Sequence, residues 1–141
     1  MTKDIILRYL LIGIFLVATA TGLNVIFQGI AGIPESGLIT QASVDNELRF
    51  MAVFWVAFGV YCLMLSRNVY ENKNNIVFVA VVFLCSGVAR LLSFVTVGQP
   101  IELFIGAMAV ELVLPVVLFG LSNSLNSQDE RQLQPTEGAS E

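Results

Sequence analysis

The sequence contains no histidine and only two cysteines among its 141 residues. Histidine is the most common metal ligand and the usual general base near neutral pH, so its absence removes the commonest basis for a metal centre or an acid–base catalyst. Cys62 and Cys85 lie on separate apolar stretches, with no C-x-x-C pair that would indicate a zinc site or a thiol-redox centre. We therefore expect no bound metal, no cofactor and no catalytic residue.

Charged residues are also scarce. They make up 13% of the chain, against about a quarter in typical soluble domains, while 56% of the residues are hydrophobic. The formal net charge is −4, but residues 122–141 alone contain four acidic residues and one arginine. The remainder is close to neutral, so nucleic acid is not an expected partner. The composition predicts a protein whose principal partner is the lipid bilayer.

The sequence instead contains long apolar runs. The last two runs are each about as long as a helix that crosses a hydrocarbon core of roughly 30 Å, and only Gly98-Gln99-Pro100 separates them. We predict an all-α fold, an integral membrane four-helix bundle made of two antiparallel hairpins. The expected spans are residues 5–30, 50–65, 76–97 and 101–121, followed by a disordered polar tail over residues 122–141.

The first run leaves two alternatives open. Ala18-Thr19-Ala20 resembles a signal-peptidase site, so cleavage after it is one interpretation. The apolar run continues past this point to residue 30, however, which favours an uncleaved first helix.

Two charges interrupt the last two spans. At about 1.5 Å per residue, Arg90 lies roughly 10 Å and Glu111 roughly 15 Å from the hairpin end. The difference of about 5 Å is within the reach of an arginine side chain. Because a lone charge at mid-membrane costs about 2.5–3.5 kcal/mol on insertion scales, each should seek the bundle interior and a partner. We predict that Arg90 and Glu111 form a pair.

Three further residues surround this pair in the sequence. Pro115 cannot donate a hydrogen bond to the carbonyl of Glu111, so one turn carries both a carboxylate and an unpaired acceptor. Such a turn suits a cation, a hydroxyl or a water. Ser86 and Ser93 lie four residues before and three after Arg90, on one helix face. Two interpretations remain open: a structural ion pair with serines that bind the helices together, or a ligand or proton site.

A second group of polar residues lies around the first connection. Asn24 and Gln28 share one face of the first helix, where they either hydrogen-bond neighbouring helices or line a cavity. Asp45 and Arg49 are spaced four apart, a favourable pairing distance, and Asp45 and Glu47 suit the first turn of the second span.

The distribution of basic residues predicts the orientation. Four spans place both termini and the 66–75 connection on one side, together with all lysines and arginines outside the spans except Arg49. By the positive-inside rule the termini are cytoplasmic, in a bacterial inner membrane, and residues 31–49 and 98–100 face outward. The polar residues then gather in the outer half of the bundle, as an outward-facing pocket with Glu111 at its floor.

Several strings carry a family resemblance. They are Glu47-Leu48-Arg49-Phe50 after Asp45, A-R-L-L-S around Arg90, Gly98-Gln99-Pro100, and E-L-V-x-P from Glu111 to Pro115. Over roughly residues 5–120 the chain resembles the bacterial domain-of-unknown-function 4345 family, whose members resemble DoxX-like small four-helix membrane proteins. The resemblance implies a fold and a location but no activity. It also supports the interpretation that four charged residues form a single constellation: Glu47, Arg49, Arg90 and Glu111.

Three functional hypotheses follow, besides a purely structural role. The first is a binding or accessory module whose pocket holds a lipid, a quinone-like or other small amphipathic molecule, or docks a partner subunit. The second is a small proton-coupled transporter that uses Glu111. Small multidrug exporters carry their glutamate in the first span, where this chain has none, and Arg90 would hold Glu111 ionised. An enzyme is third, because only Glu47 and Glu111 offer acid–base groups.

Overall fold

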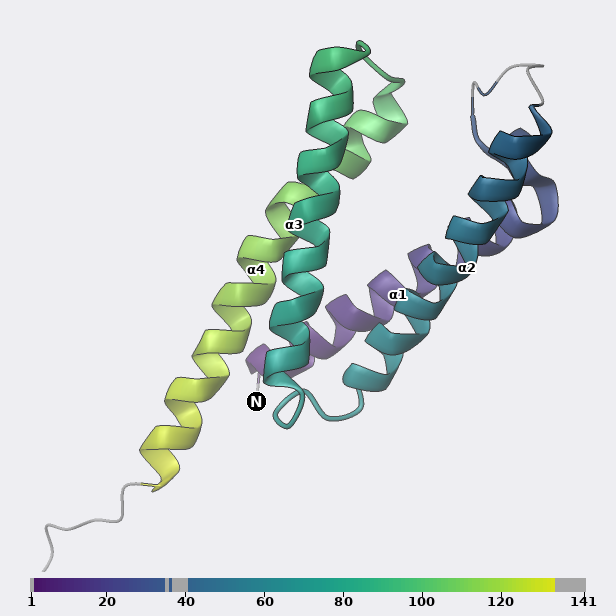
Figure 1. The fold of residues 1–141 in the computed structure, drawn as a ribbon. Helices are drawn as coiled ribbons and strands as arrows, with labels where there is room; N and C mark the ends of the chain where they lie inside the picture. Colours follow the sequence, from purple (N-terminus) through teal and green to yellow (C-terminus); the bar gives the residue numbers. More distant parts are fainter. Residues whose placement is uncertain (1, 35, 37–40, 134–141) are drawn as a thin grey trace, which may run out of the picture. The chain divides into compact units, whose positions relative to one another are not determined.

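The computed structural model describes residues 2–34, 36 and 41–133. Over these residues the chain is almost entirely helical and contains no β-strand, so the predicted all-α fold class is confirmed (Figure 1). The elements are α1 (Thr2–Gln28), the short 3-10 helix η1 (Gly29–Gly32), α2 (Ala42–Leu65), α3 (Lys73–Thr96) and α4 (Glu102–Leu133). Arg8–Asn68 forms one compact unit, built on α1 and α2. Residues 2–7 and 69–133, which include α3 and α4, belong to the other.

All four helices are long and apolar enough to cross a membrane. The apolar segments are 24 to 30 residues long, which at about 1.5 Å per residue exceeds a hydrocarbon core of roughly 30 Å. Large apolar side chains are exposed along each helix, for example Leu16, Phe54, Leu92 and Val116. Such surfaces are favourable against lipid, and they agree with the predicted membrane environment.

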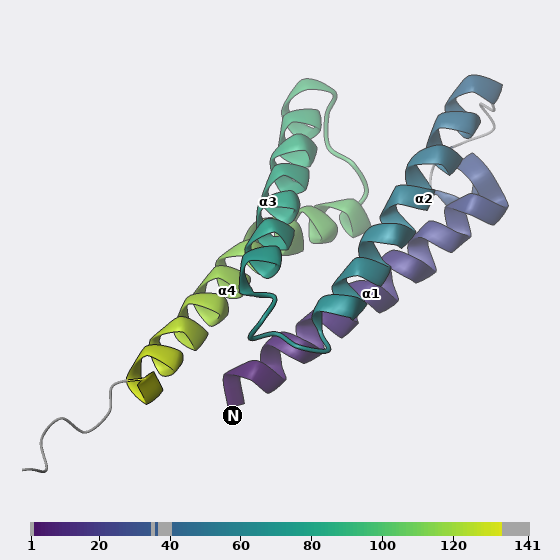
Figure 2. The same ribbon diagram turned by 60° about the horizontal axis from the view of Figure 1, so that its bottom comes forward.

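The α1–α2 hairpin is packed through glycines. α1 and α2 lie side by side and run in opposite directions (Figures 1 and 2). A Cβ on Gly22 of α1 would lie 2.5 Å from Val56 Cγ2, and a Cβ on Gly59 of α2 would lie 3.0 Å from the Ala18 Cβ. Small residues of this kind let helix backbones approach closely in a membrane, where packing rather than the hydrophobic effect holds helices together.

The α3–α4 hairpin has its own close contact. Its connection is short, and Gly98 there has a φ of 125°, a conformation that favours glycine. Within α3, a Cβ on Gly87 would lie 2.8 Å from Leu112 Cδ2 and 3.2 Å from the carbonyl carbon of Glu111. Gly87 therefore brings α3 against α4 at the level of Glu111. The predicted antiparallel hairpin at Gly98-Gln99-Pro100 is confirmed.

Two helices extend well beyond the predicted spans at one end each, while the other helix ends lie within three residues of the predicted limits. α2 begins at Ala42 instead of residue 50, and α4 continues past residue 121 to Leu133. Hydropathy marks the part of a helix that suits lipid, whereas the backbone hydrogen bonds of the helix continue into the polar residues beyond it. Ser122 and Leu125 of the extension are both buried. Residues 134–141 of the predicted tail lie outside the described residues.

Candidate functional site

The predicted pair of charges, Arg90 and Glu111, is present in the α3–α4 hairpin. Arg90 Nε of α3 donates to Glu111 Oε2 of α4 at 2.8 Å, which confirms the pairing. Ser86, one turn before Arg90, donates its hydroxyl to the same oxygen at 3.0 Å. The carboxylate is almost enclosed, since Glu111 is only 5% exposed. One oxygen of a buried carboxylate thus receives two donors from a single face of α3.

Two neighbouring residues, Gly87 and Pro115, explain how the Glu111 carboxylate comes to lie against α3. Gly87 follows Ser86 directly and has no side chain to hold α4 away, so the short Ser86 hydroxyl reaches across. One turn after Glu111, Pro115 is fully buried within α4. Because proline has no N–H, it cannot donate the helical hydrogen bond to the Glu111 carbonyl. The same turn of α4 therefore presents both a carboxylate and a backbone acceptor that lacks its helical donor.

Arg90 retains unused hydrogen-bonding capacity. A guanidinium carries five N–H donors, and only the one on Nε is engaged by Glu111. In the described part of the chain, neither terminal nitrogen has a hydrogen-bond partner. The Arg90 side chain is 40% exposed, and its Cζ lies 5.8 Å from the centre of the Phe104 ring, within cation–π range. The free end of the guanidinium is therefore held in place and open to a ligand.

Arg90 lines a hollow of about 180 Å³, which we call the Arg90 cleft. Its lining combines one cation and one hydroxyl with apolar walls, which is the usual composition of a small-molecule site. The lining residues are Arg90, Ser93, Phe94, Pro100, Phe104 and Met108.

Sequence reasoning identified Arg90 and Ser93 as candidates but missed the apolar walls of the cleft. Phe94 lies four residues after Arg90, and Phe104 and Met108 are themselves four apart, with Met108 three before Glu111. Helical spacing places such residues on the faces that carry the two charges. This helical spacing was the signal in the sequence from which the apolar walls of the cleft could have been predicted.

A second polar cluster, which we call the α1–α2 clasp, joins the end of α1 to the start of α2. Arg49 Nε donates to Asp45 Oδ2 at 2.8 Å, so the predicted pairing is confirmed. Arg49 Nη1 also donates to the Ile26 carbonyl at 2.5 Å, and Asp45 Oδ1 accepts the Ile30 N–H at 2.8 Å. Asp45 was expected to satisfy N–H groups of its own helix. Its carboxylate satisfies the turn after α1 instead.

The amides of α1 complete the hydrogen bonding of this turn. Asn24 Nδ2 donates to the Gly32 carbonyl at 2.7 Å, and Gln28 Nε2 donates to Asn24 Oδ1 at 2.7 Å. Gly29 adopts a left-handed φ of 61° at the point where α1 gives way to η1. These bonds favour the interpretation in which Asn24 and Gln28 hold the hairpin together over the one in which they line a cavity.

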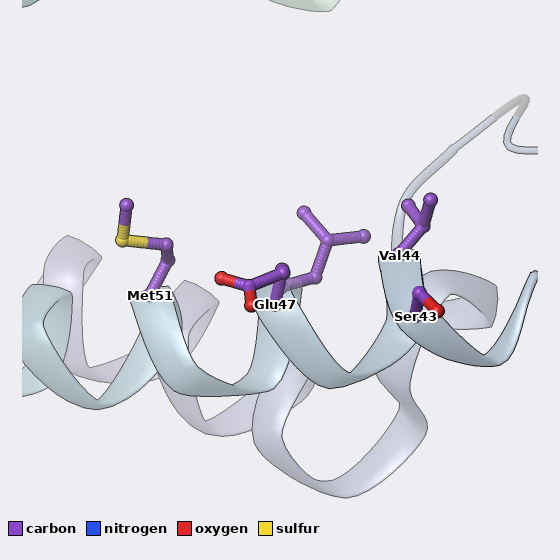
Figure 3. Close-up of a pocket in the computed structure, with 5 residues that line it drawn as sticks. Ser43, Val44, Glu47 and Met51 are labelled. Carbon is purple, nitrogen blue, oxygen red and sulfur yellow. The ribbon is translucent and has the colours of Figure 1, made fainter.

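Glu47 belongs to neither the Arg90–Glu111 pair nor the α1–α2 clasp. Figure 3 shows Ser43, Val44, Glu47 and Met51 projecting from the same side of α2. With Leu48 these residues line an open hollow of about 330 Å³, in which Glu47 is the only charged group. This hollow is larger than the Arg90 cleft, but all of its lining residues come from the single helix α2. That Glu47, Arg49, Arg90 and Glu111 form one constellation stays a prediction.

Among the described residues, no group of three or more acidic or cysteine side chains is placed to hold a metal ion. Cys62 is buried, Cys85 is exposed, and both are free thiols.

Comparison with known proteins gives one positive result. No curated protein and no solved structure matches the chain significantly. A family model described as "Domain of unknown function (DUF4345)" matches residues 6–122. The match includes both halves of the Arg90–Glu111 pair, the α1–α2 clasp and the membrane-spanning part of all four helices. The chain therefore belongs to the DUF4345 family, and its four long apolar helices make it a membrane protein.

Proposed function

We propose that this protein is a binding or accessory module of the membrane, which holds the polar end of a small amphipathic molecule in the Arg90 cleft. The observation that carries the proposal is Arg90 itself, which lines a hollow with apolar walls and whose terminal nitrogens have no hydrogen-bond partner among the described residues.

The free-energy cost of leaving polar groups unpaired in a membrane favours a bound ligand in the Arg90 cleft. A polar group that lacks a hydrogen-bond partner inside a membrane costs several kcal/mol, and ionisable residues there mark ligand or ion sites more often than not. Glu111 anchors the Nε of Arg90, while Phe104 lies against the guanidinium. The arginine is thus oriented before any ligand arrives, which lowers the entropic cost of binding. Water or lipid fills the cleft by default, and an amphiphile with an acceptor group fills it better.

A small proton-coupled transporter that uses Glu111 is the alternative. Proton cycling would require the carboxylate to be released and recaptured, yet Glu111 is almost enclosed and its Oε2 already accepts two hydrogen bonds. The geometry therefore gives less support to transport than to binding.

A cleft-filling substitution tests the binding proposal. Ser93 is exposed and lines the cleft without joining the ion pair, so Ser93→Trp should block the hollow and leave Arg90–Glu111 intact. We expect at least one of oleate, oleyl alcohol and lysophosphatidylcholine to bind the purified full chain saturably in detergent. Its affinity should fall at least tenfold in Ser93→Trp, as measured by native mass spectrometry.

The neighbouring substitution Leu92→Trp is the matched control, because Leu92 is 64% exposed and does not line the cleft. It should bind as the wild type does. Equal binding by Ser93→Trp and the wild type would contradict the proposal. A substrate-dependent proton flux in proteoliposomes, lost in Glu111→Gln, would instead favour the transporter.

The proposal includes a location and an orientation. We place the protein in a bacterial inner membrane with both termini in the cytoplasm, so that the 98–100 connection and the Arg90 cleft beside it open outward. The excess of lysine and arginine on the side of the termini supports this orientation.

Reporter fusions test the orientation directly. Alkaline phosphatase is active only in the periplasm, so it should be active when inserted within residues 31–44 and inactive when fused after Glu141. The reverse pattern would place the cleft on the cytoplasmic side.

A further inference from the structure

We infer that the polar end recognised at the Arg90 cleft is an oxyanion, a carboxylate or a phosphate, and that the rest of the amphiphile stays in the bilayer. The inference rests on the proposed function of the same cleft and names the chemistry of its ligand.

The free edge of Arg90 has the geometry of an oxyanion receptor. Nε is bound to Glu111 Oε2, so the remaining edge is the one formed by the two terminal nitrogens, which have no partner in the part of the chain that the structure describes. Two parallel N–H groups match the two oxygens of a carboxylate or a phosphate. A single alcohol or ketone oxygen would satisfy only one of them. The Phe104 ring restrains this edge by cation–π contact.

The negative charge of Glu111 does not prevent an anion from binding in the Arg90 cleft. Glu111 Oε2 receives the Ser86 hydroxyl as well as Arg90, so the carboxylate does not depend on the guanidinium alone. Arg90 can therefore be shared between two oxyanions, one on each edge. Ser93 adds a hydroxyl to the lining of the cleft, and it offers a donor to an oxygen that Arg90 does not reach.

The size of the cleft determines how much of the ligand it holds. Its volume of about 180 Å³ is below the roughly 300–1,000 Å³ of sites that enclose a whole small molecule. It corresponds to about six waters at about 30 Å³ each, enough for a headgroup and a few methylenes. Arg90 precedes the end of α3 by six residues, about 9 Å along the helix. A lipid headgroup near the membrane surface can reach that depth while its chain remains in the bilayer.

The experiment compares ligands that share one chain and differ at the polar end. Oleate, oleoyl lysophosphatidate, oleyl alcohol and methyl oleate are titrated into the purified full chain in detergent, at a pH where oleate is ionised. We expect the two oxyanions to bind at least tenfold more tightly than the alcohol and the ester. Arg90→Lys keeps the charge but lacks the two-nitrogen edge, so the ratio of oxyanion affinity to alcohol affinity should fall at least threefold. Arg67→Lys, an exposed arginine outside the cleft, should change neither.

Each outcome separates the inference from the proposed function. Oleyl alcohol that binds as tightly as oleate, with both blocked by Ser93→Trp, would overturn the oxyanion and leave the amphiphile site standing. No binding by any of the four would overturn both. Acetate or inorganic phosphate that binds as tightly as oleate would show a free-anion site instead of a lipid site. If Arg90→Lys does not fold, Ser93→Ala should weaken oleoyl lysophosphatidate more than oleyl alcohol, and equal weakening of the two would contradict the inference.

Discussion

Replacing Arg90 by leucine is expected to lower the free energy of unfolding by about 3–5 kcal/mol, and replacing Glu111 as well should recover much of the loss. Removing one member of a buried pair leaves an uncompensated charge, whereas replacing both with apolar residues is often close to neutral. The two single variants should differ. Glu111 is 5% exposed and cannot reach water, while the long Arg90 side chain can turn towards the membrane surface. Arg90→Leu should therefore be the more destabilising.

A double-mutant cycle in detergent measures this coupling. Unfolding free energies of the wild type, Arg90→Leu, Glu111→Leu and the double variant give the interaction energy directly. As a control, Arg90→Leu combined with Lys73→Leu should be additive within about 0.5 kcal/mol, because Lys73 begins α3 roughly 25 Å along the helix from Arg90 and distant sites do not couple. If the Arg90→Leu and Glu111→Leu effects are additive as well, the two side chains do not pair in the folded protein.

The second large effect is expected at Gly29. Its φ of 61° is left-handed, which costs an L-residue about 1–2 kcal/mol. A Cβ there would also collide with Asp45 Oδ1 and lie 2.5 Å from Arg49 Nη2, so the α1–α2 clasp would have to move. Together these terms predict that Gly29→Ala destabilises by about 2–4 kcal/mol, measured by unfolding in detergent.

Two comparisons divide the Gly29 effect into its parts. In an Asp45→Ala background the collision is reduced, so Gly29→Ala should cost only the backbone term of about 1–2 kcal/mol. Gly13 of α1 has no atom within 4 Å of an added Cβ, so Gly13→Ala should stabilise by about 0.5–1 kcal/mol. The same cost for Gly29→Ala in both backgrounds would show that the clasp does not occupy the space beside Gly29.

Interactions determined by local spacing or by the cost of buried charge were predictable from the sequence. Arg90 and Glu111 had to meet because a short connection fixes the register of the two spans and neither charge is tolerated alone. Asp45 and Arg49 are neighbours on one helix face whatever the rest of the chain does. The all-α class followed from the long apolar runs.

The other features of the fold and of the candidate site could not be predicted, because they depend on the three-dimensional course of the chain. The bond from the Ile30 N–H to Asp45 spans fifteen residues and a turn that no periodicity describes. The walls of the Arg90 cleft depend on which way Phe104 and Met108 point, and hydropathy carries no such information. The full lengths of the helices could not be predicted, because apolar runs mark only the lipid-facing segment, while α2 and α4 continue through polar residues.

A high-resolution structure of the protein purified from membranes, without added ligand, tests the central claim most directly. We expect density in the Arg90 cleft, with a polar end at the two terminal nitrogens of Arg90 and a chain that leaves past Phe94 and Phe104 towards the lipid. Such density should be absent in Ser93→Trp and retained in Leu92→Trp. A cleft filled by the protein's own side chains, with the guanidinium of Arg90 fully paired, would contradict the account.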